Sequence, residues 1–102
     1  MDEFINEELI QNAKKLMELY DIIYEELKNK VKYIINKKIT DENIIEHMLD
    51  DIVNIPTEKC NQLFLYFCQY VSLFNKEVVN NYIDLYNDLY GPIDKDKILK
   101  KN

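Results

Sequence analysis

The chain has 102 residues, 47% of them apolar and 31% charged, with a net charge of −6, which fits one folded domain and excludes a disordered tail. One Gly and two Pro leave few turn-forming residues, so we expect few connections between long helices. The acidic balance and the absence of Arg argue against nucleic acid as the main partner, because phosphate and guanine recognition favours the paired donors of Arg.

The composition also indicates an AT-rich genome, such as that of a virus, a phage, or a low-GC bacterium with its mobile elements. Residue types with AT-rich codons are abundant, at 14 Ile, 13 Lys, 12 Asn, 8 Tyr and 4 Phe. Those with GC-rich codons are scarce, at one Ala, one Gly, two Pro and no Arg.

The first predicted helix covers about residues 3–37. Its apolar positions recur with a helical period, at Ile5, Leu9, Ala13, Leu16, Tyr20, Ile23, Leu27, Val31 and Ile34. A break near Asn29 is an open alternative. Phe4, Ile22 and Tyr33 fall off this face and indicate a second contact surface on the same helix.

Three further helices are predicted at about residues 41–54, 57–74 and 76–90. Thr40 and Thr57 are suitable N-caps, and Pro56 ends the second helix. The apolar period runs unbroken through 60–89, so the last two helices are either continuous or divided near Asn75, and we favour the division. Gly91 and Pro92 form a clear stop.

The predicted fold is therefore a compact, all-α, antiparallel bundle of four helices. Residues 1–92 form the single helical domain, and residues 93–102 form a basic C-terminal tail. The longest apolar-rich run has 12 residues, Leu63 to Phe74, which is too short to span a bilayer.

The sequence favours an intracellular, reducing, cytoplasmic location. The acidic start lacks the basic and apolar regions of a signal peptide. Cys60 and Cys68 stand eight residues apart on one predicted helix, too far to bridge each other, so both are expected to be reduced and buried.

Chemistry-bearing residues are scarce, and we expect no enzyme activity, no cofactor and no metal site. The chain has one His, His47, four residues before Asp51 and four after Asn43. These three share a helix ridge, where a solvent-facing histidine beside a carboxylate is the ordinary interpretation and a weak metal or acid–base pair the alternative.

The predicted partner-binding residues are apolar or tyrosine side chains on the last two helices: Leu65, Tyr66, Leu73, Tyr82, Tyr86 and Tyr90. The helix at 57–74 is apolar nearly all round, so it is either the central helix of the bundle or it presents an outer face to a partner or a second copy. The tyrosines either bound the core or form an interface, for which their large area and polar tip are suited.

Charge is unevenly distributed along the chain. Residues 1–26 carry eight acids and two lysines, whereas residues 27–40 carry five lysines and no acid. Glu42, Glu46 and Asp50 form an acidic strip at four-residue steps, which is either a solvated face or a surface for a basic partner.

The sequence thus predicts a small, acidic, non-enzymatic protein-binding module of a virus, phage or low-GC mobile element: a regulator, inhibitor or immunity-type protein. In size and helix layout the chain is similar to small helical bacteriocin immunity proteins, a likeness that carries no residue role. The alternatives are a homo-oligomeric structural subunit, with the partner a second copy in a homodimer, and a nucleic-acid accessory protein using the lysine-rich end.

Overall fold

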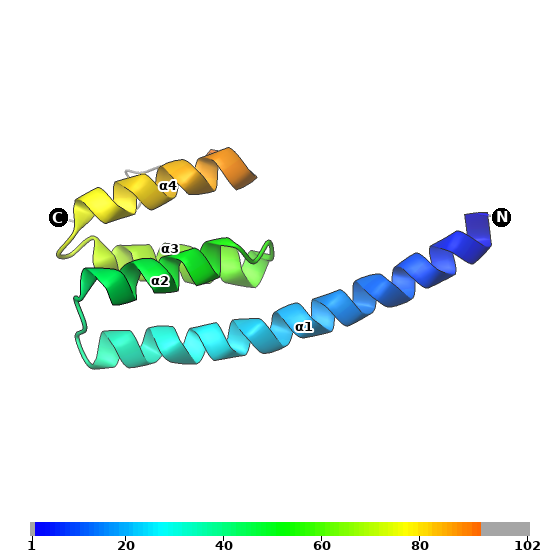
Figure 1. The fold of residues 1–102 in the computed structure, drawn as a ribbon, viewed down its shortest axis with the longest axis horizontal. Coiled ribbons are helices and arrows are strands. Elements are labelled where there is room, and N and C mark those ends of the chain that lie inside the picture. Colours follow the sequence, from blue (N-terminus) through cyan, green and yellow to red (C-terminus); the bar gives the residue numbers. More distant parts are fainter. Residues whose placement is uncertain (1, 93–102) are drawn as a thin grey trace.

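The computed structural model describes the backbone of residues 2–92 and the side chains of residues 7–92. Four helices follow one another along the chain: α1 (Asp2–Asn36), α2 (Glu42–Val53), α3 (Glu58–Val71) and α4 (Lys76–Tyr90). Consecutive helices run antiparallel (Figure 1). The predicted all-α bundle of four helices is therefore confirmed, whereas the predicted basic tail, 93–102, lies outside the described residues.

Helices α2 and α3 occupy the centre of the bundle, since each of them packs against the other three helices. Phe64 and Phe67 on α3 are fully buried. The ring of Phe64 stacks on that of Tyr86 from α4, with centroids 5.1 Å apart. This position explains why the α3 sequence is apolar nearly all round, since a helix with three neighbours must bury most of its surface.

The helix boundaries follow local capping chemistry. Thr57 caps α3 and Asn75 caps α4, each accepting a hydrogen bond from a backbone N–H, as predicted. Two details of the prediction were wrong. Asp41 caps α2 in place of Thr40, because its carboxylate accepts from the Ile44 N–H at 3.1 Å. Helix α3 ends at Val71, and a turn over 72–74 separates it from α4.

The C-terminus of α1 is closed by a Schellman motif without a glycine. The N–H of Ile39 donates to the carbonyl of Ile34 at 3.0 Å, and the N–H of Lys38 donates to that of Ile35 at 3.1 Å. Lys38 takes the left-handed conformation that this motif requires, with φ of 54°. The chain therefore turns sharply into α2 at a residue type that disfavours this backbone region.

The molecule is more elongated than the predicted compact bundle. Its radius of gyration is 16.2 Å, against about 13 Å for a compact domain of this length. The cause is α1, whose 35 residues form one unbroken helix of about 52 Å, so no break occurs near Asn29. The other helices have 12, 14 and 15 residues, and they accompany only the C-terminal part of α1 (Figure 1).

Candidate interaction surface

The N-terminal part of α1 extends beyond the bundle as a single helix, and we call residues 2–22 the arm (Figure 1). Every described side chain from Glu7 to Leu19 is exposed. Leu9 and Leu16 expose 57% and 47% of their surface, and Ile22 exposes 60%. Among residues 7–22 of the arm, whose side chains the structure describes, six large apolar residues are exposed: Leu9, Ile10, Leu16, Met17, Leu19 and Ile22.

Such a helix has little to stabilise it alone. Isolated helices of this length are only marginally stable in water, and most helical stability in proteins comes from packing an amphipathic face. A run of exposed apolar side chains along one element commonly marks an interaction site. The arm is therefore built like a helix that gains its stability from a partner.

The arm leaves the bundle at a fixed point where α1 meets the start of α3. Lys59 lies 3.5 Å from the carboxylate of Asp21, and its ammonium stands 5.6 Å from the ring centroid of Tyr24. Lys28 approaches the same ring at 5.7 Å. Beyond this point Leu27, Val31 and Ile34 are buried, and α1 becomes part of the core.

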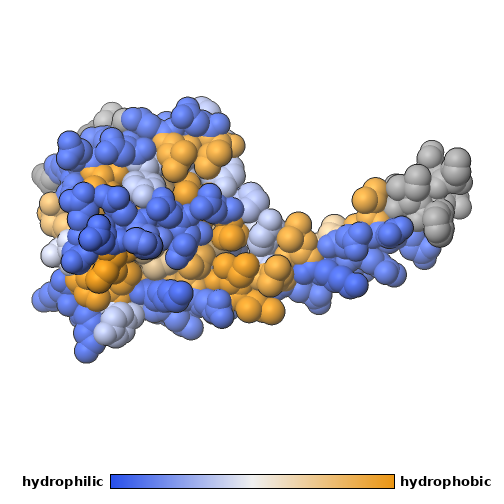
Figure 2. All heavy atoms as spheres, in the orientation of Figure 1, coloured by the Kyte–Doolittle hydropathy of each residue, from blue (hydrophilic) through white to orange (hydrophobic). Residues whose placement is uncertain are grey.

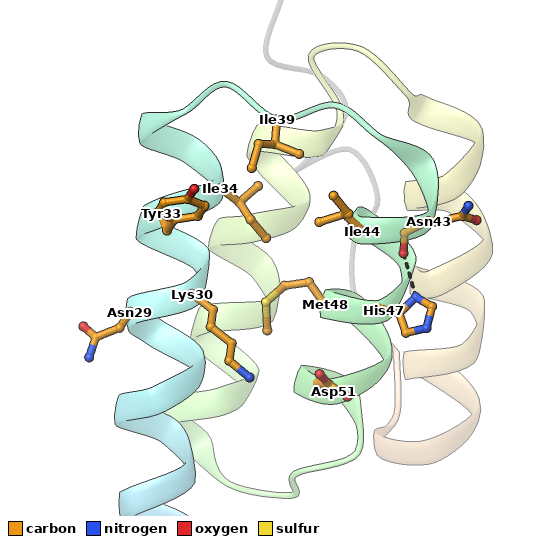
Figure 3. A pocket seen from close by; sticks show the side chains of 10 residues that line it. All are labelled: Asn29, Lys30, Tyr33, Ile34, Ile39, Asn43, Ile44, His47, Met48 and Asp51. Carbon is orange, nitrogen blue, oxygen red and sulfur yellow. Dashed lines mark hydrogen bonds between the residues drawn. The ribbon is translucent and has the colours of Figure 1, made fainter.

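An open groove of about 630 Å³ lies between the C-terminal part of α1 and α2. Tyr33 and Ile34 approach it from α1, Ile44 and Met48 from α2, and Ile39 from the connecting loop (Figure 3). Its wall is almost wholly apolar. Figure 2 shows apolar surface both here and along α1 beyond the bundle, on the same face of the molecule.

Polar groups stand only at the edges of this groove. Lys30 and Asp51 lie at its open end, whereas Asn43 and His47 lie on the outer side of α2 (Figure 3). The exposed imidazole of His47 donates from Nδ1 to the carbonyl of Asn43 at 2.8 Å, a bond within its own helix. The arrangement suits an apolar occupant with charged flanks better than it suits acid–base chemistry.

The predicted partner-binding residues on and after α3 lie in different places. Leu65 is half-buried against the core. Tyr66 is 54% exposed and lines a small hollow between α1 and α3. Leu73 is 74% exposed and lies in the turn before α4, where it is not part of α3.

The three predicted tyrosines of α4 are half-buried, and Tyr82 and Tyr90 direct their hydroxyls toward α2. Tyr82 donates to the Asp50 carboxylate at 2.7 Å, and Tyr90 donates to the carbonyl of Val53 at 2.6 Å. The ring of Tyr86 lies between Phe64 and Tyr90. Burial raises the pKa of all three phenols, and the Asp50 carboxylate contributes to the shift at Tyr82.

The residues of the predicted acidic strip, Glu42, Glu46 and Asp50, follow one another along the side of α2 that faces α4. A side-chain hydrogen bond with Glu42 raises the pKa of Glu46, and burial and the neighbouring carboxylates of Glu42 and Asp50 add to the shift. The hydroxyl of Tyr82 joins this ridge at Asp50. The strip therefore stands on a different side of α2 from the groove, which is lined by Ile44 and Met48.

Both cysteines are free and buried on α3, as predicted. Burial raises the pKa of each thiol, most strongly at Cys68. A protonated thiol is a poor nucleophile and a poor metal ligand, so neither group is suited to chemistry.

Within residues 7–92, no three His, Cys, Asp or Glu side chains converge in a way that would hold a metal ion. None of the helices that the structure describes combines the length and the apolar character that a membrane crossing requires. No family model, no curated protein and no solved structure matches the chain.

Proposed function

We propose that this chain is a small, acidic, non-enzymatic protein-binding module that recognises its partner through α1 and the adjoining groove. The observation that supports the proposal is the arm, which exposes six large apolar residues and has none of the other described helices, α2 to α4, beside it. Helix-in-groove recognition is a common mode of protein binding, and this chain offers both of its components.

The charge of the arm favours a protein over a membrane as the partner. Residues 1–26 carry eight acids and two lysines, whereas helices that lie on anionic lipid surfaces are rich in Lys and Arg. The composition supports an origin in a virus, phage or low-GC mobile element, where a regulator, inhibitor or immunity-type protein fits this size. Two buried, unpaired thiols suit a reducing, cytoplasmic environment.

The experiment that tests this proposal compares capture by the natural chain and by an arm variant. The chain is expressed with an affinity tag, as the bait, in cells of an organism whose genome encodes it. An untagged copy of the same chain is expressed in the same cells. Leu9→Gln/Leu16→Gln removes apolar surface from the arm, and Gln11→Ala/Lys14→Ala changes the opposite side of the same helix as a matched control. Because all four side chains are exposed, neither change disturbs the bundle core.

We expect the natural chain and the control to retain a stoichiometric protein, either a second copy or another polypeptide, and the arm variant to lose it. Capture that is the same for all three chains, or no captured protein at all, would contradict the proposal. Circular dichroism confirms that each variant keeps its helices.

A further inference from the structure

A continuous exposed track runs along α1, over the arm and beside the bundle. It comprises Leu9, Ala13, Leu16, Leu19, Ile22, Glu26, Lys30 and Tyr33, all of them exposed. The steps are three or four residues and average about 3.4, close to the period of 3.5 of a left-handed coiled coil. Its first part, Leu9 to Leu16, continues the line of the buried Leu27, Val31 and Ile34 beyond the bundle. Its second part, from Leu19 to Tyr33, lies beside that buried line.

We infer that the occupant of this track is a second copy of the chain, with the two α1 helices antiparallel about a two-fold axis between Leu19 and Ile22. The inference rests on the proposed function and names its partner. Reversing the track pairs Leu9 with Tyr33, Leu16 with Glu26, and Leu19 with Ile22. The arm of each copy then enters the groove of the other beside Tyr33, Ile39 and Ile44.

The location of the two surfaces satisfies the requirement of a symmetric dimer. In a two-fold contact the same surface of each subunit meets its copy, so arm and groove must lie on one face. Figure 2 shows both on the same face, displaced from each other along the long axis of the molecule. A two-fold rotation about an axis between them exchanges arm and groove and uses each of them twice.

Charge complementarity favours the antiparallel direction. Residues 2–8 carry four acids and no base, whereas residues 30–38 carry four lysines and no acid. Within the part of the chain that the structure describes, the lysines of this cluster, Lys30, Lys32, Lys37 and Lys38, enter no ion pair. Antiparallel pairing places the acidic end of one α1 against the basic end of the other, whereas parallel pairing would align like charges.

A stable dimer must bury a sufficient area on each copy. A stable interface takes about 800 Å² from each partner, which is about a ninth of the 7218 Å² accessible surface of this chain. Each copy contributes an exposed helix face along about 36 Å of α1, from Leu9 to Tyr33, and a groove of about 630 Å³. The side chains of Glu26 and Lys30 within the track reach the edges of the contact, as long charged side chains do in coiled coils.

A charge-exchange experiment with sedimentation equilibrium tests the inference. Two variants are prepared, Glu7→Lys/Glu8→Lys and Lys37→Glu/Lys38→Glu. In an antiparallel dimer of either variant the altered end carries no net charge, so both pairs of ends lose their attraction. In a mixed dimer one pair is reversed and attracts, while the other pair is the natural one and also attracts.

We expect the natural chain to sediment at twice its 12.3 kDa mass. Each variant alone should dimerise with an affinity at least about tenfold lower. Mixing the two variants should restore the dimer, and Leu9→Gln/Leu16→Gln should abolish it. A natural chain that stays at 12.3 kDa at every concentration overturns the inference, and so does a dimer that the mixture fails to restore. If a monomeric chain still captures another protein through its arm, the proposed function stands and only the identity of the partner is wrong.

Discussion

The hydroxyl of Tyr70 on α3 donates a hydrogen bond of 2.7 Å to the carbonyl of Ile39, 31 residues earlier in the loop between α1 and α2. Ile39 also donates its N–H to Ile34, so this loop is held from both sides. The side chain of Ile39 lines the groove. Helix α3 therefore fixes one wall of the candidate interaction surface.

Removing this hydroxyl should destabilise the fold. Tyr70→Phe leaves the Ile39 carbonyl without its side-chain donor and should lower the free energy of unfolding by about 1 kcal/mol, as for a typical intramolecular hydrogen bond. Urea denaturation followed by circular dichroism measures the change. Tyr66→Phe is the control, because its exposed hydroxyl makes no hydrogen bond within residues 7–92, and an equal loss there would refute the assigned role of Tyr70.

The left-handed conformation of Lys38 predicts a stabilising substitution. Lys38→Gly relieves the steric cost of a φ of 54° and should raise the free energy of unfolding by about 0.5–1 kcal/mol, after the entropy of the more flexible unfolded chain is subtracted. Lys37→Gly removes the same charge without relieving a positive φ and should be neutral or destabilising. Differential scanning calorimetry compares the two, and equal melting temperatures would argue against backbone strain at Lys38.

The two cysteines should be unreactive in the folded protein. Cys60 and Cys68 are buried and their thiol pKa values are raised by burial, so both accessibility and ionisation oppose alkylation. In native buffer we expect a disulfide reagent to modify neither thiol, and in denaturant to modify both. Rapid labelling of one thiol in native buffer would show that α3 is less well covered than the structure indicates.

Removing the charge of Glu46 in the acidic strip should stabilise the fold, and the size of this gain should depend on pH. Because the pKa of Glu46 is raised above its ordinary 4.5, the folded state retains this proton more readily, and the associated stability is lost as the pH rises through the folded pKa. Glu46→Gln should therefore raise the melting temperature at pH 7 and change it little well below pH 4.5. A melting temperature at pH 7 that Glu46→Gln leaves unchanged would exclude repulsion along the strip.

Local signals accounted for most of the fold. The helical period and the polar residues Thr57 and Asn75 were enough to predict four helices and the break between α3 and α4. The Schellman motif was missed because its left-handed position holds Lys38, where the sequence signal is normally glycine. Asp41 was passed over as a cap because Thr40 beside it is an equally good candidate in the sequence.

The overhang of α1 was not evident from its sequence, because the same apolar period continues from Leu9 to Ile34 whether or not a neighbour is present. Only the shorter lengths of the other helices reveal that the arm has none. The groove was equally hidden, since it joins residues of α1 and α2 that no sequence pattern connects. A signal did exist in Ile22 and Tyr33, which fall off the buried face and belong to the exposed track.

The most direct test of the central claim, that two copies pair through antiparallel α1 helices, is an intermolecular distance measured by spin labelling. A single label on Gln11→Cys is selective if Cys60 and Cys68 are unreactive, and the side chain at position 11 faces away from the track. With an axis near residue 21, antiparallel pairing predicts about 30 Å between the labels of two copies. A distance of about 20 Å, the width of two helices, as parallel pairing would give, or no intermolecular distance at all, would contradict the account.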